Sequence, residues 1–388
     1  MNSPAAAVAV SAVIPCLNEE RTIGLCVEKA LKGLAALGMP GEVIVVDNGS
    51  TDRSAEIARS LGARVVAQPV KGYGAALQAG IEASRGRIVV MGDADDSYDW
   101  TEIAPFVRKV EEGYDLVLGN RFAGGIAPGA MPGLHRYLGN PVLSAITRLA
   151  FKVDVGDVHC GMRAFTKAAF DRMRTGTPGM EFATEMVANA ARNGLRIAEV
   201  PTRLYPDKRD RPPHLRSFRD GWRHLRFILT YAPDYLYLAP GAAMLLAGLA
   251  LQALLVAGPV EIDGVYLGIH YLALGAMLSL VGFNVINLGV LAKALLVQRY
   301  TGLKSRTVAF LSRSFSLEGG LVAGALLIVA GLGTDGAILA IRLANPGEAM
   351  EGTVHLAFVA TTMVVLGLNL LFTSFLLAMV VAERGQGS

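Results

Sequence analysis

Short apolar runs alternate with longer stretches of helical periodicity from Val8 to about Glu199. The apolar runs are VAVSAVIP, EVIVVDN, ARVVAQ, RIVVMGD and DLVLGN. The helical stretches between them cover residues 20–37, 52–61, 73–84 and 101–112. Because a helix separates each run from the next, the pattern predicts an α/β fold with a mostly parallel sheet and helices on both of its faces.

Polar residues gather where the predicted strands end. Open sheets of this kind bind ligands beyond the carboxyl ends of their strands. The residues at these positions are Pro15, Asn18 and Glu19 after the first strand, Asp47, Asn48 and Ser50 after the second, Asp93 and Asp95 after the fourth, and Asn120 and Arg121 after the fifth. We expect the binding site at this edge of the sheet.

The segment RIVVMGDADDSYDW, residues 87–100, places an apolar run directly before several carboxylates. Asp93 and Asp95 lie two residues apart on a turn, so both can face one cation. Hard oxygen ligands favour Mg²⁺ or Mn²⁺ over zinc. The alternative is that these acids form turns and cap the helix that begins near Thr101, and we assign Asp99 to that role.

Two turn regions carry polar residues with more than one interpretation. Asp47 precedes the turn NGSTD, where its carboxylate either binds a ribose or a base or simply forms the turn. The stretch KGYG at 71–74 lacks the glycine spacing of dinucleotide sites and P-loops, which argues against both. Residues 123–139 are rich in glycine and proline around Arg136, and they predict a long mobile loop.

Two further segments bring acids and a histidine close in sequence. DVGDVHCGMRAF, residues 154–165, carries Asp157 and His159 before an apolar strand. A lone histidine is more often a hydrogen-bonded structural residue than a ligand, and we interpret His159 in that way. Glu181 and Glu185 share one face of a predicted helix, either as solvated surface or as part of a site.

The composition places part of the chain in lipid. The 388 residues are 52% hydrophobic, with a mean hydropathy of +0.42, which is too apolar for a wholly soluble protein. Residues 236–257, 266–290, 321–343 and 354–381 form apolar segments, the third of them interrupted by Asp335 and Arg342. Spanning a bilayer takes about 20 apolar residues, so we expect a transmembrane domain of four helices.

The charge distribution predicts how the chain crosses the membrane. Residues 258–265 contain two acids and no Lys or Arg, whereas residues 292–317 are basic. The beginning of the chain does not have the pattern of a signal peptide, and the three cysteines suit a reducing compartment. By the positive-inside rule, the N-terminal domain and both termini face the cytoplasm. The net charge of +3 gives no reason to expect a nucleic-acid partner.

A basic amphipathic helix precedes the first apolar segment. SFRDGWRHLRFILTYAP places Phe218, Trp222, Leu225 and Leu229 on one stripe with arginines beside it, a pattern typical of a helix on a membrane surface. TVAFLSRSF at 307–315 predicts a second such helix. The glycines of GLVAGALLIVAGLG permit close helix packing, within one chain or between the protomers of a homo-oligomer. We therefore divide the chain into an N-terminal α/β domain at residues 1–213, an interfacial amphipathic helix at 214–235 and a transmembrane domain at 236–388.

Several of these motifs together resemble one family. The ordered set VIPCLNEE, VVDNGSTD, MGDADDSY, GNRF, HCGMRAF and DGWRHLRF resembles the polyprenyl-phosphate glycosyltransferases of glycosyltransferase family 2, such as dolichyl-phosphate mannose synthases and bacterial lipid-phosphate glucosyltransferases. The resemblance covers the N-terminal domain closely and the membrane region in layout. It implies a GT-A fold that binds a nucleotide-sugar, UDP- or GDP-linked, and a divalent metal. It also implies inverting transfer of a hexose to a polyprenyl phosphate in the lipid bilayer.

The resemblance also assigns site residues. Asp93 and Asp95 match the family's metal-binding acid pair, and Ser97 stands where some relatives carry a further metal ligand, a glutamine. Arg121 matches an arginine at the donor and acceptor phosphates. The expected substrate-binding residues are Pro15, Leu17, Glu19, Val46, Asp47, Lys71 and Ala94. The QxxRW motif of processive polysaccharide synthases is absent, so synthesis of a polymer is disfavoured.

The chemistry of such a transfer requires a stabilised leaving diphosphate and a nucleophile on the opposite face of the sugar. A lipid phosphate is already largely ionised at neutral pH, by analogy with phosphoserine, and so needs positioning more than deprotonation. We expect Arg136, Lys208 and Arg209 to hold its charge, with Asp157 as either a base or an orienting group.

Two other functions remain open from the sequence. Transfer to a non-phosphate lipid or to a glycan would require a general base such as Asp157 or Glu185. A lipid-sugar flippase with a regulatory soluble domain would instead require polar residues along the spans, where Asp335, Arg342 and a few amides are the candidates.

Overall fold

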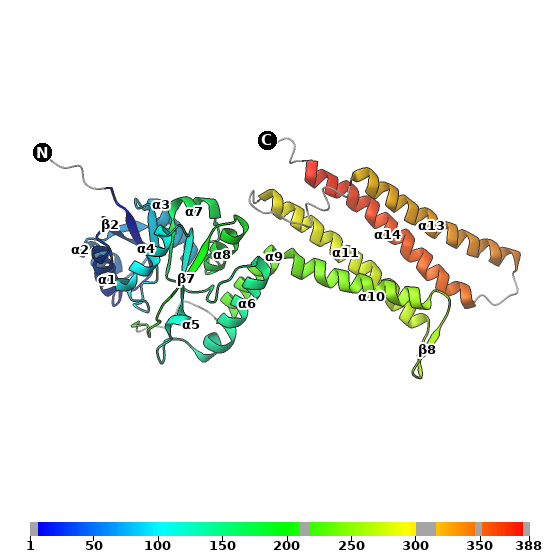
Figure 1. The fold of residues 1–388 in the computed structure, drawn as a ribbon, viewed down its shortest axis with the longest axis horizontal. Helices are drawn as coiled ribbons and strands as arrows, with labels where there is room; N and C mark the ends of the chain where they lie inside the picture. The colour runs from blue at the N-terminus through cyan, green and yellow to red at the C-terminus, as the bar shows by residue number, and fades with distance from the viewer. Residues whose placement is uncertain (1–6, 210–216, 300–315, 346–350, 383–388) are drawn as a thin grey trace. The chain divides into compact units, whose positions relative to one another are not determined.

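The computed structural model describes residues 7–209, 217–299, 316–345 and 351–382. The chain forms two compact units, unit 1 at Met1–Ile228 and unit 2 at Leu229–Ser388 (Figure 1). The predicted boundary between residues 213 and 214 lies outside the described residues, and so does the interfacial helix predicted at 307–315.

Unit 1 is built on a seven-stranded sheet with the strand order β3-β2-β1-β4-β6-β5-β7. The strands are β1 Val10–Cys16, β2 Gly41–Asp47, β3 Arg64–Ala67, β4 Ile88–Met91, β5 Leu116–Asn120, β6 Arg163–Thr166 and β7 Ile197–Pro201. β6 pairs antiparallel with β4 and β5, and the other pairs are parallel. The predicted mostly parallel α/β fold is therefore confirmed.

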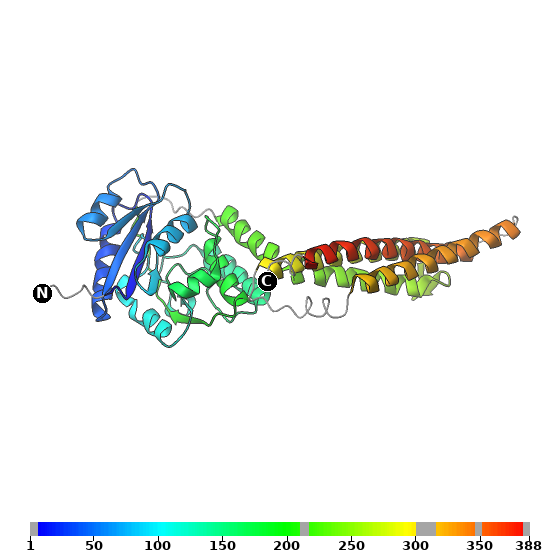
Figure 2. The same ribbon diagram turned by 90° about the horizontal axis from the view of Figure 1, so that it is seen from above.

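Helices cover both faces of this sheet, as Figure 2 shows. One face packs against α1 (Ile23–Ala36), α2 (Ser54–Ser60), the short helix η1 (Trp100–Glu102) and α4 (Ala104–Glu111). The other packs against α3 (Tyr73–Ala83), α7 (Lys167–Met173) and α8 (Phe182–Arg192). β1 contributes Ala12 and Ile14 to the first core and Val13 to the second, because successive strand residues point to opposite faces.

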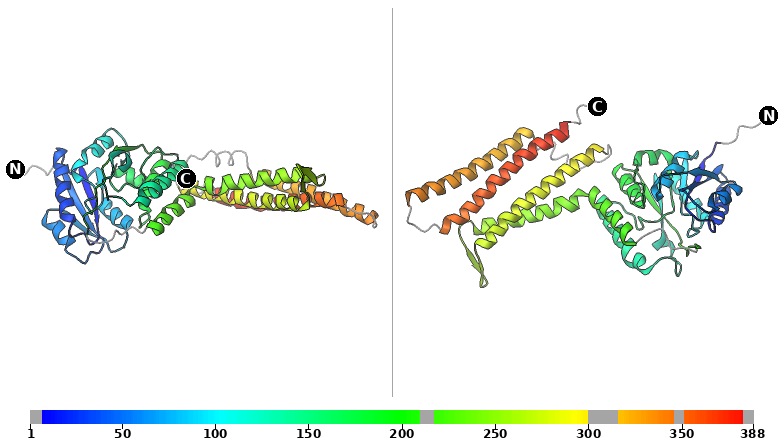
Figure 3. Two further views of the ribbon diagram at one scale, coloured as in Figure 1. Left: turned by 90° about the horizontal axis from the view of Figure 1, so that it is seen from below. Right: turned by 180° about the vertical axis from the view of Figure 1, so that it is seen from behind.

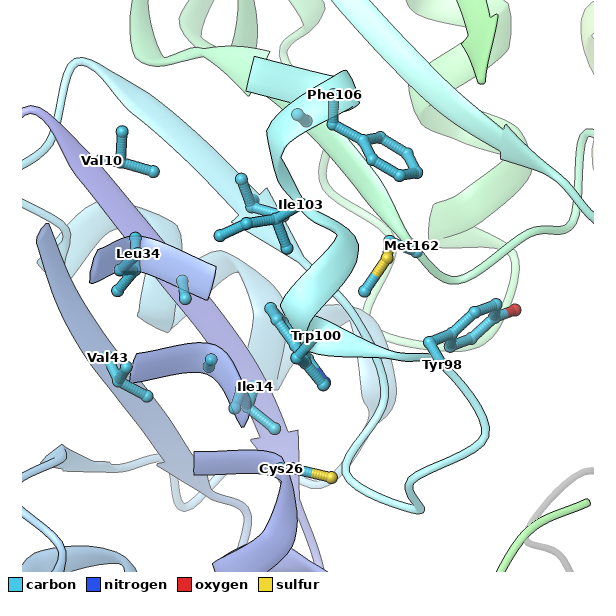
Figure 4. Close-up of a cluster of buried hydrophobic side chains, with 14 of the residues drawn as sticks. Val10, Ile14, Cys26, Leu34, Val43, Tyr98, Trp100, Ile103, Phe106 and Met162 are labelled. Atoms are coloured by element: carbon cyan, nitrogen blue, oxygen red, sulfur yellow. The ribbon is translucent and has the colours of Figure 1, made fainter. Parts of the chain in front are cut away.

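The loop that follows β4 is anchored in the first of these cores. Trp100 is fully buried among apolar side chains (Figure 4), and its Nε1 donates to the carbonyl oxygen of Asp93 at 3.2 Å. A Cβ on Gly33 of α1 would lie 2.3 Å from the carbonyl oxygen of Trp100, so only glycine allows this approach. Asp99 caps η1 by accepting from the Thr101 amide at 3.0 Å, which confirms its predicted capping role.

The segment predicted as a long loop is helical at both ends. α5 (Arg121–Gly124) begins directly after β5, and Asn120 caps it by accepting from the Ala123 amide. η2 (His135–Gly139) is a turn of π-helix that leads into α6 (Asn140–Phe151). The glycine and proline content predicted a loop correctly only for the central part of residues 123–139. The helices at its two ends have four and five residues, which is too short to leave a clear periodicity in the sequence.

The described residues of unit 2 contain four helical segments long and apolar enough to cross a membrane, at Asp234–Leu255, Ile269–Val297, Leu317–Ala344 and Thr353–Val380. They belong to η3 (Asp234–Leu238) with α10 (Ala239–Leu255), α11 (Ile269–Arg299), α13 (Leu317–Ala344) and α14 (Glu351–Ala382). A hairpin of β8 (Val260–Ile262) and β9 (Val265–Leu267) joins the first two. The expectation of four apolar helices of membrane-spanning length is confirmed, and the third runs as one helix through Asp335 and Arg342.

Glycines set the helix packing in unit 2. α10 lies along α11, and α13 lies along α14 (Figure 3). A Cβ on Gly248 would lie 2.5 Å from the carbonyl oxygen of Gly275, and one on Gly324 would lie 2.8 Å from that of Gly367. The expectation that glycines bring helices together within the chain is therefore confirmed. Gln252 adds a hydrogen bond between α10 and α11 by donating to Ser279 Oγ at 2.8 Å.

Candidate functional site

Unit 1 contains a cavity of about 410 Å³ at the carboxyl ends of its parallel strands. The pairing of β1 with β2 places Cys16 beside Asp47. β4 ends at Met91, two residues before Asp93. The cavity is lined by nine of the residues predicted from sequence: Pro15, Leu17, Glu19, Lys71, Asp93, Ala94, Asp95, Arg121 and Arg209. Chain segments far apart in sequence thus meet in one place.

Six predicted residues do not belong to this lining: Val46, Asp47, Ser97, Arg136, Asp157 and Lys208. Val46 is fully buried in the core of the sheet. Asp47 accepts from the Ser50 amide at 2.9 Å, which is the turn-forming role left open for it above. The Arg136 guanidinium lies 5.5 Å from the ring centre of Tyr137.

The acid pair Asp93 and Asp95 is held by hydrogen bonds from Tyr73 and Ser97. Tyr73, at the first position of α3, donates its hydroxyl to Asp93 Oδ1 at 3.0 Å. Ser97 donates its amide and hydroxyl to Asp95 Oδ1 at 3.0 and 2.6 Å, so it acts on the site through Asp95. Burial, and then the charge of Asp95, raise the pKa of Asp93 to about 6. This acid pair therefore has an electrostatic need for a cation.

Two basic residues before α9 neutralise part of this acidic loop. Arg209 Nη2 donates to Asp95 Oδ2 at 2.7 Å, and its Nη1 lies 3.4 Å from Glu19 Oε1. Lys208 Nζ donates to Asp96 Oδ2 at 2.7 Å. Asp96 is 2% exposed and has a positive φ of 60°, a strained backbone state that the ion pair helps to hold. Lys208 and Arg209, two of the three predicted phosphate ligands, thus contact the acid loop.

Arg121 and Asp157 form a buried, two-pronged ion pair. Arg121 Nε donates to Asp157 Oδ2 at 2.6 Å, and its Nη2 donates to Oδ1 at 2.8 Å. The Arg121 amide also donates to Oδ2 at 3.1 Å. Because both oxygens of Asp157 accept from Arg121, this geometry suits an orienting group better than a base.

Two histidines meet beside the cavity. His159 lines it, and its ring lies edge-on to that of His224 with 4.7 Å between centres. His224 Nδ1 pairs with Thr184 Oγ1 at 2.8 Å. His159 Nε2 is shielded from solvent and lacks a hydrogen-bond partner among the described residues, so the expectation of a hydrogen-bonded structural histidine is wrong for this nitrogen. Burial, and then His224, lower the pKa of His159 well below its usual value, which keeps the ring neutral at pH 7.

Glu185 is a structural carboxylate. It is 5% exposed, so the solvated-surface interpretation is wrong for this residue. Its Oε2 accepts from the Gly176 amide and from both the amide and the hydroxyl of Thr177, at 2.6 to 3.0 Å. Glu185 thus fixes the loop before α8 and has little capacity left for proton transfer.

Asn48, which the sequence placed at the end of the second strand, also lines the cavity. It ties the ends of β2 and β3 together, because its side-chain Nδ2 donates to the carbonyls of Gln68 and Val70 and its Oδ1 accepts from the Gly72 backbone amide. Sequence reasoning missed other lining residues. Tyr73 was considered only as part of a glycine motif. Arg219 and Arg223 of α9 (Ser217–Tyr231) also line the cavity. Their i, i+4 spacing beside the aromatic stripe was the signal that could have identified them.

The acids Glu19, Asp93, Asp95 and Asp220 line the cavity, and Asp93 and Asp95 are the two that follow one strand. Within the described ranges, no group of three or more His, Cys, Asp or Glu side chains is arranged to hold a metal ion. Mg²⁺ commonly binds through one or two carboxylates, with the rest of its ligands from substrate phosphates and water. Two carboxylates on one cavity therefore fit a cation that arrives together with a phosphorylated ligand.

Two stretches of the chain match known families. Residues 11–174 match the family described as Glycosyl transferase family 2, and residues 290–381 match the Glycosyltransferase family 2 C-terminal transmembrane region. The low-salt glycan biosynthesis hexosyltransferase Agl6 of Haloferax volcanii is 38% identical over 369 residues, which cover 95% of this chain and 88% of that protein.

Two further proteins match the N-terminal part. The dolichyl-phosphate hexose transferase of Haloferax volcanii is 34% identical over 195 residues, covering 50% of this chain and 81% of that protein. A crystal structure of glucosyl-3-phosphoglycerate synthase from Mycobacterium tuberculosis with Mn²⁺, UDP and glucosyl-3-phosphoglycerate is 25% identical, with a TM-score of 0.43, over 58% of this chain and 78% of that one.

Proposed function

Because the chain belongs to glycosyltransferase family 2, we propose that it transfers a hexose from a UDP- or GDP-sugar to a membrane polyprenyl phosphate, with inversion at the anomeric carbon. The observation that carries the proposal is the cavity lined at once by the Asp93/Asp95 pair and by arginines, in a chain that also has four membrane-length helices. The name of the dolichyl-phosphate hexose transferase among its relatives supports a lipid phosphate as acceptor.

The donor diphosphate binds at the acid pair, where Asp93 and Asp95 would hold Mg²⁺ or Mn²⁺. Such a cation would neutralise the negative charge that develops on the leaving diphosphate. Asp95 is positioned for this by Ser97, and Asp93 by Tyr73. Arg121 adds a fixed positive charge at the cavity wall, and Asp157 orients its guanidinium.

The acceptor attacks as an ionised phosphate, so no protein base is needed. This supports a phosphate acceptor over a hydroxyl acceptor, since both candidate bases are engaged: Asp157 by Arg121 and Glu185 by Thr177. The flippase alternative expected polar residues along the spans. Among the described amides of these helices, Gln252 donates to Ser279 Oγ and Asn284 donates to the carbonyl oxygen of Leu280, and both are packing contacts.

The test uses the purified full-length protein in detergent. It is incubated with a panel of UDP- and GDP-sugars and a short polyprenyl phosphate, and the product is read by mass and anomeric configuration. We expect transfer of the sugar to the polyprenyl phosphate and none to the matching polyprenol. The transfer should be lost in EDTA and restored when Mg²⁺ or Mn²⁺ is added back. Equal transfer to polyprenol, or no transfer with any donor, would overturn the proposal.

The proposal places unit 1 and both termini in the cytoplasm, where nucleotide-sugars are available. The acidic β8–β9 turn then faces outside, and the start of α13 faces the cytoplasm. A membrane-impermeant maleimide should label Asp263→Cys and not Glu318→Cys in intact cells. The native Cys16, Cys26 and Cys160 are buried and give little background. The opposite labelling pattern would contradict this orientation.

A further inference from the structure

Helix α9 presents three different rows of side chains. Asp220 and His224 are buried at 2% and 7% exposure and face the body of unit 1. Phe218 and Trp222 are 86% and 57% exposed. Arg219 and Arg223 line the cavity. Each pair is spaced i, i+4, so each forms a row along the helix, and the arginine row lies directly beside the aromatic row.

The other cations of the cavity are engaged elsewhere. Lys71 Nζ donates to the carbonyl oxygens of Asn48 and Gly49. Arg121 is bound by Asp157, and Arg209 binds Asp95 and Glu19. Because these three cations already have partners, a second anion needs other cations.

Arg219 and Arg223 retain capacity for an anion. They contact Asp220 Oδ1 over 3.9 and 3.4 Å, and 53% and 38% of their side chains are exposed. A guanidinium has five N–H donors, and such loose contacts leave most of them for a ligand. Buried Asp220 contacts Arg219 Nε and Arg223 Nη1, while the bond of His224 to Thr184 ties α9 to α8.

The ligand of this row must combine a phosphate with an apolar chain. Two arginines at the cavity suit a phosphate monoester, which accepts several charge-assisted hydrogen bonds. The exposed aromatic row beside them suits contact with lipid. We propose that Arg219 and Arg223 bind the phosphate of the lipid acceptor while Phe218 and Trp222 contact its chain and the surrounding bilayer. This inference rests on the proposed function for the identity of the acceptor.

This inference goes beyond Arg136 and Lys208, the phosphate ligands expected from the sequence. Arg136 is outside the cavity lining, and Lys208 binds Asp96. Asp96 lies in the acid loop, so Lys208 serves that loop.

The test compares charge removal at three positions of one helix. Arg219→Gln and Arg223→Gln should each lower kcat/KM for polyprenyl phosphate by about 10- to 150-fold at saturating donor, with the donor KM nearly unchanged. Arg226→Gln is the matched control, because Arg226 is exposed on the same helix and is not a lining residue. Equal effects of all three changes, or a loss confined to the donor KM, would overturn the inference.

A binding measurement separates the sources of phosphate. Inorganic phosphate should compete with a fluorescent polyprenyl phosphate for the wild-type protein, and the Arg219→Gln/Arg223→Gln double variant should bind both more weakly. Trp222→Ser should weaken binding of the long-chain lipid and leave inhibition by inorganic phosphate unchanged. If the wild type transfers no sugar to a lipid phosphate, the proposed function fails. If it does and the double variant binds lipid phosphate normally, only this inference fails.

Discussion

The two units of the protein position their important groups in different ways. Unit 1 holds charged side chains at strand ends with dense hydrogen bonding, as in the ion pair of Arg121 with Asp157. Unit 2 brings helices together at glycines such as Gly324, where a single methyl group would overlap a carbonyl oxygen. Removing a charge should therefore act mainly on the chemistry or on local electrostatics in unit 1, whereas adding one carbon should act on packing in unit 2.

The largest expected effect is the loss of a carboxylate from the acid pair. Asp93→Asn should lower turnover by at least about 10²- to 10³-fold, because the proposed mechanism relies on Asp93 to hold the cation that would neutralise the leaving group. The same change should leave thermal stability unchanged or slightly raised. The pKa of Asp93 is raised by burial and by Asp95, so folding works against its charge and a neutral amide relieves that cost.

A matched control for this change exists in the same loop. Asp99→Asn keeps the cap of η1, since Asn caps helices as well as Asp, and it should leave both activity and stability near wild type. The measurement is sugar transfer together with thermal unfolding for both variants. Near-normal turnover of Asp93→Asn in the presence of EDTA would refute the assignment of a metal site.

The second expected effect is on folding. Asp157→Asn leaves the buried Arg121 guanidinium without its counter-charge, and breaking a buried pair in this way typically costs about 3 to 5 kcal/mol. Denaturant unfolding measures it, with Asp154→Asn as an exposed control in the same segment. Turnover should remain measurable in whatever fraction stays folded, because in the proposed mechanism Asp157 orients Arg121 and takes no proton. Full stability with abolished turnover would identify Asp157 as a base.

The third expected effect is a dependence of stability on pH. Burial lowers the pKa of His224 to about 4, although Asp220 raises it, and Arg163 lowers it further. Below its unfolded pKa of about 6.5, the unfolded chain takes up a proton that the folded chain refuses, so this group removes stability as the pH falls. Between pH 7 and 5 the loss is about 2 kcal/mol.

Replacement of His224 isolates this contribution. His224→Gln retains a polar partner for Thr184 and removes the titration, so its unfolding free energy should fall less between pH 7 and 5 than that of the wild type. Chemical denaturation at the two pH values measures the difference. An identical pH dependence for both proteins would show that His224 is not buried as a neutral group.

The residues at the strand ends of unit 1 were predictable, because each apolar run is followed directly in the sequence by the polar residues at its end. A buried run followed by Asp93 and Asp95 places both carboxylates at a sheet edge in any parallel arrangement. The partners of these acids were not predictable, since Arg209 reaches Asp95 from 114 residues away. Periodicity also revealed the aromatic row of α9, but the arginine row became recognisable only when the cavity beside it was known.

For unit 2, the lengths of the helices were predictable from the sequence, but the contacts between the helices were not. Hydropathy identified four spans, because an apolar segment of sufficient length needs no partner to be recognised. Which glycines meet a neighbouring helix depends on helix rotation, and the sequence does not record it. Gly324 and Gly333 occur in the same glycine-rich run, yet a Cβ on Gly324 would lie 2.8 Å from Gly367 O and a Cβ on Gly333 would meet nothing within 4 Å.

This difference supports the smallest and sharpest test of the comparison. Replacing glycine by alanine in a helix is favourable by up to about 1 kcal/mol in itself, because alanine loses less backbone entropy. Gly333→Ala should therefore leave unit 2 unchanged or slightly stabilised. Gly324→Ala adds the same methyl group against a carbonyl oxygen of α14, and overpacking of this kind costs roughly 1 to 3 kcal/mol. Unfolding of the detergent-solubilised protein in SDS, followed by helix content, should rank Gly324→Ala below wild type and Gly333→Ala at or above it. Sugar transfer to a short, soluble prenyl phosphate should be the same for both variants, because the chemistry belongs to unit 1. Equal stability of the two variants would mean that α13 and α14 do not meet at Gly324, and the contrast between the units would lose its physical basis.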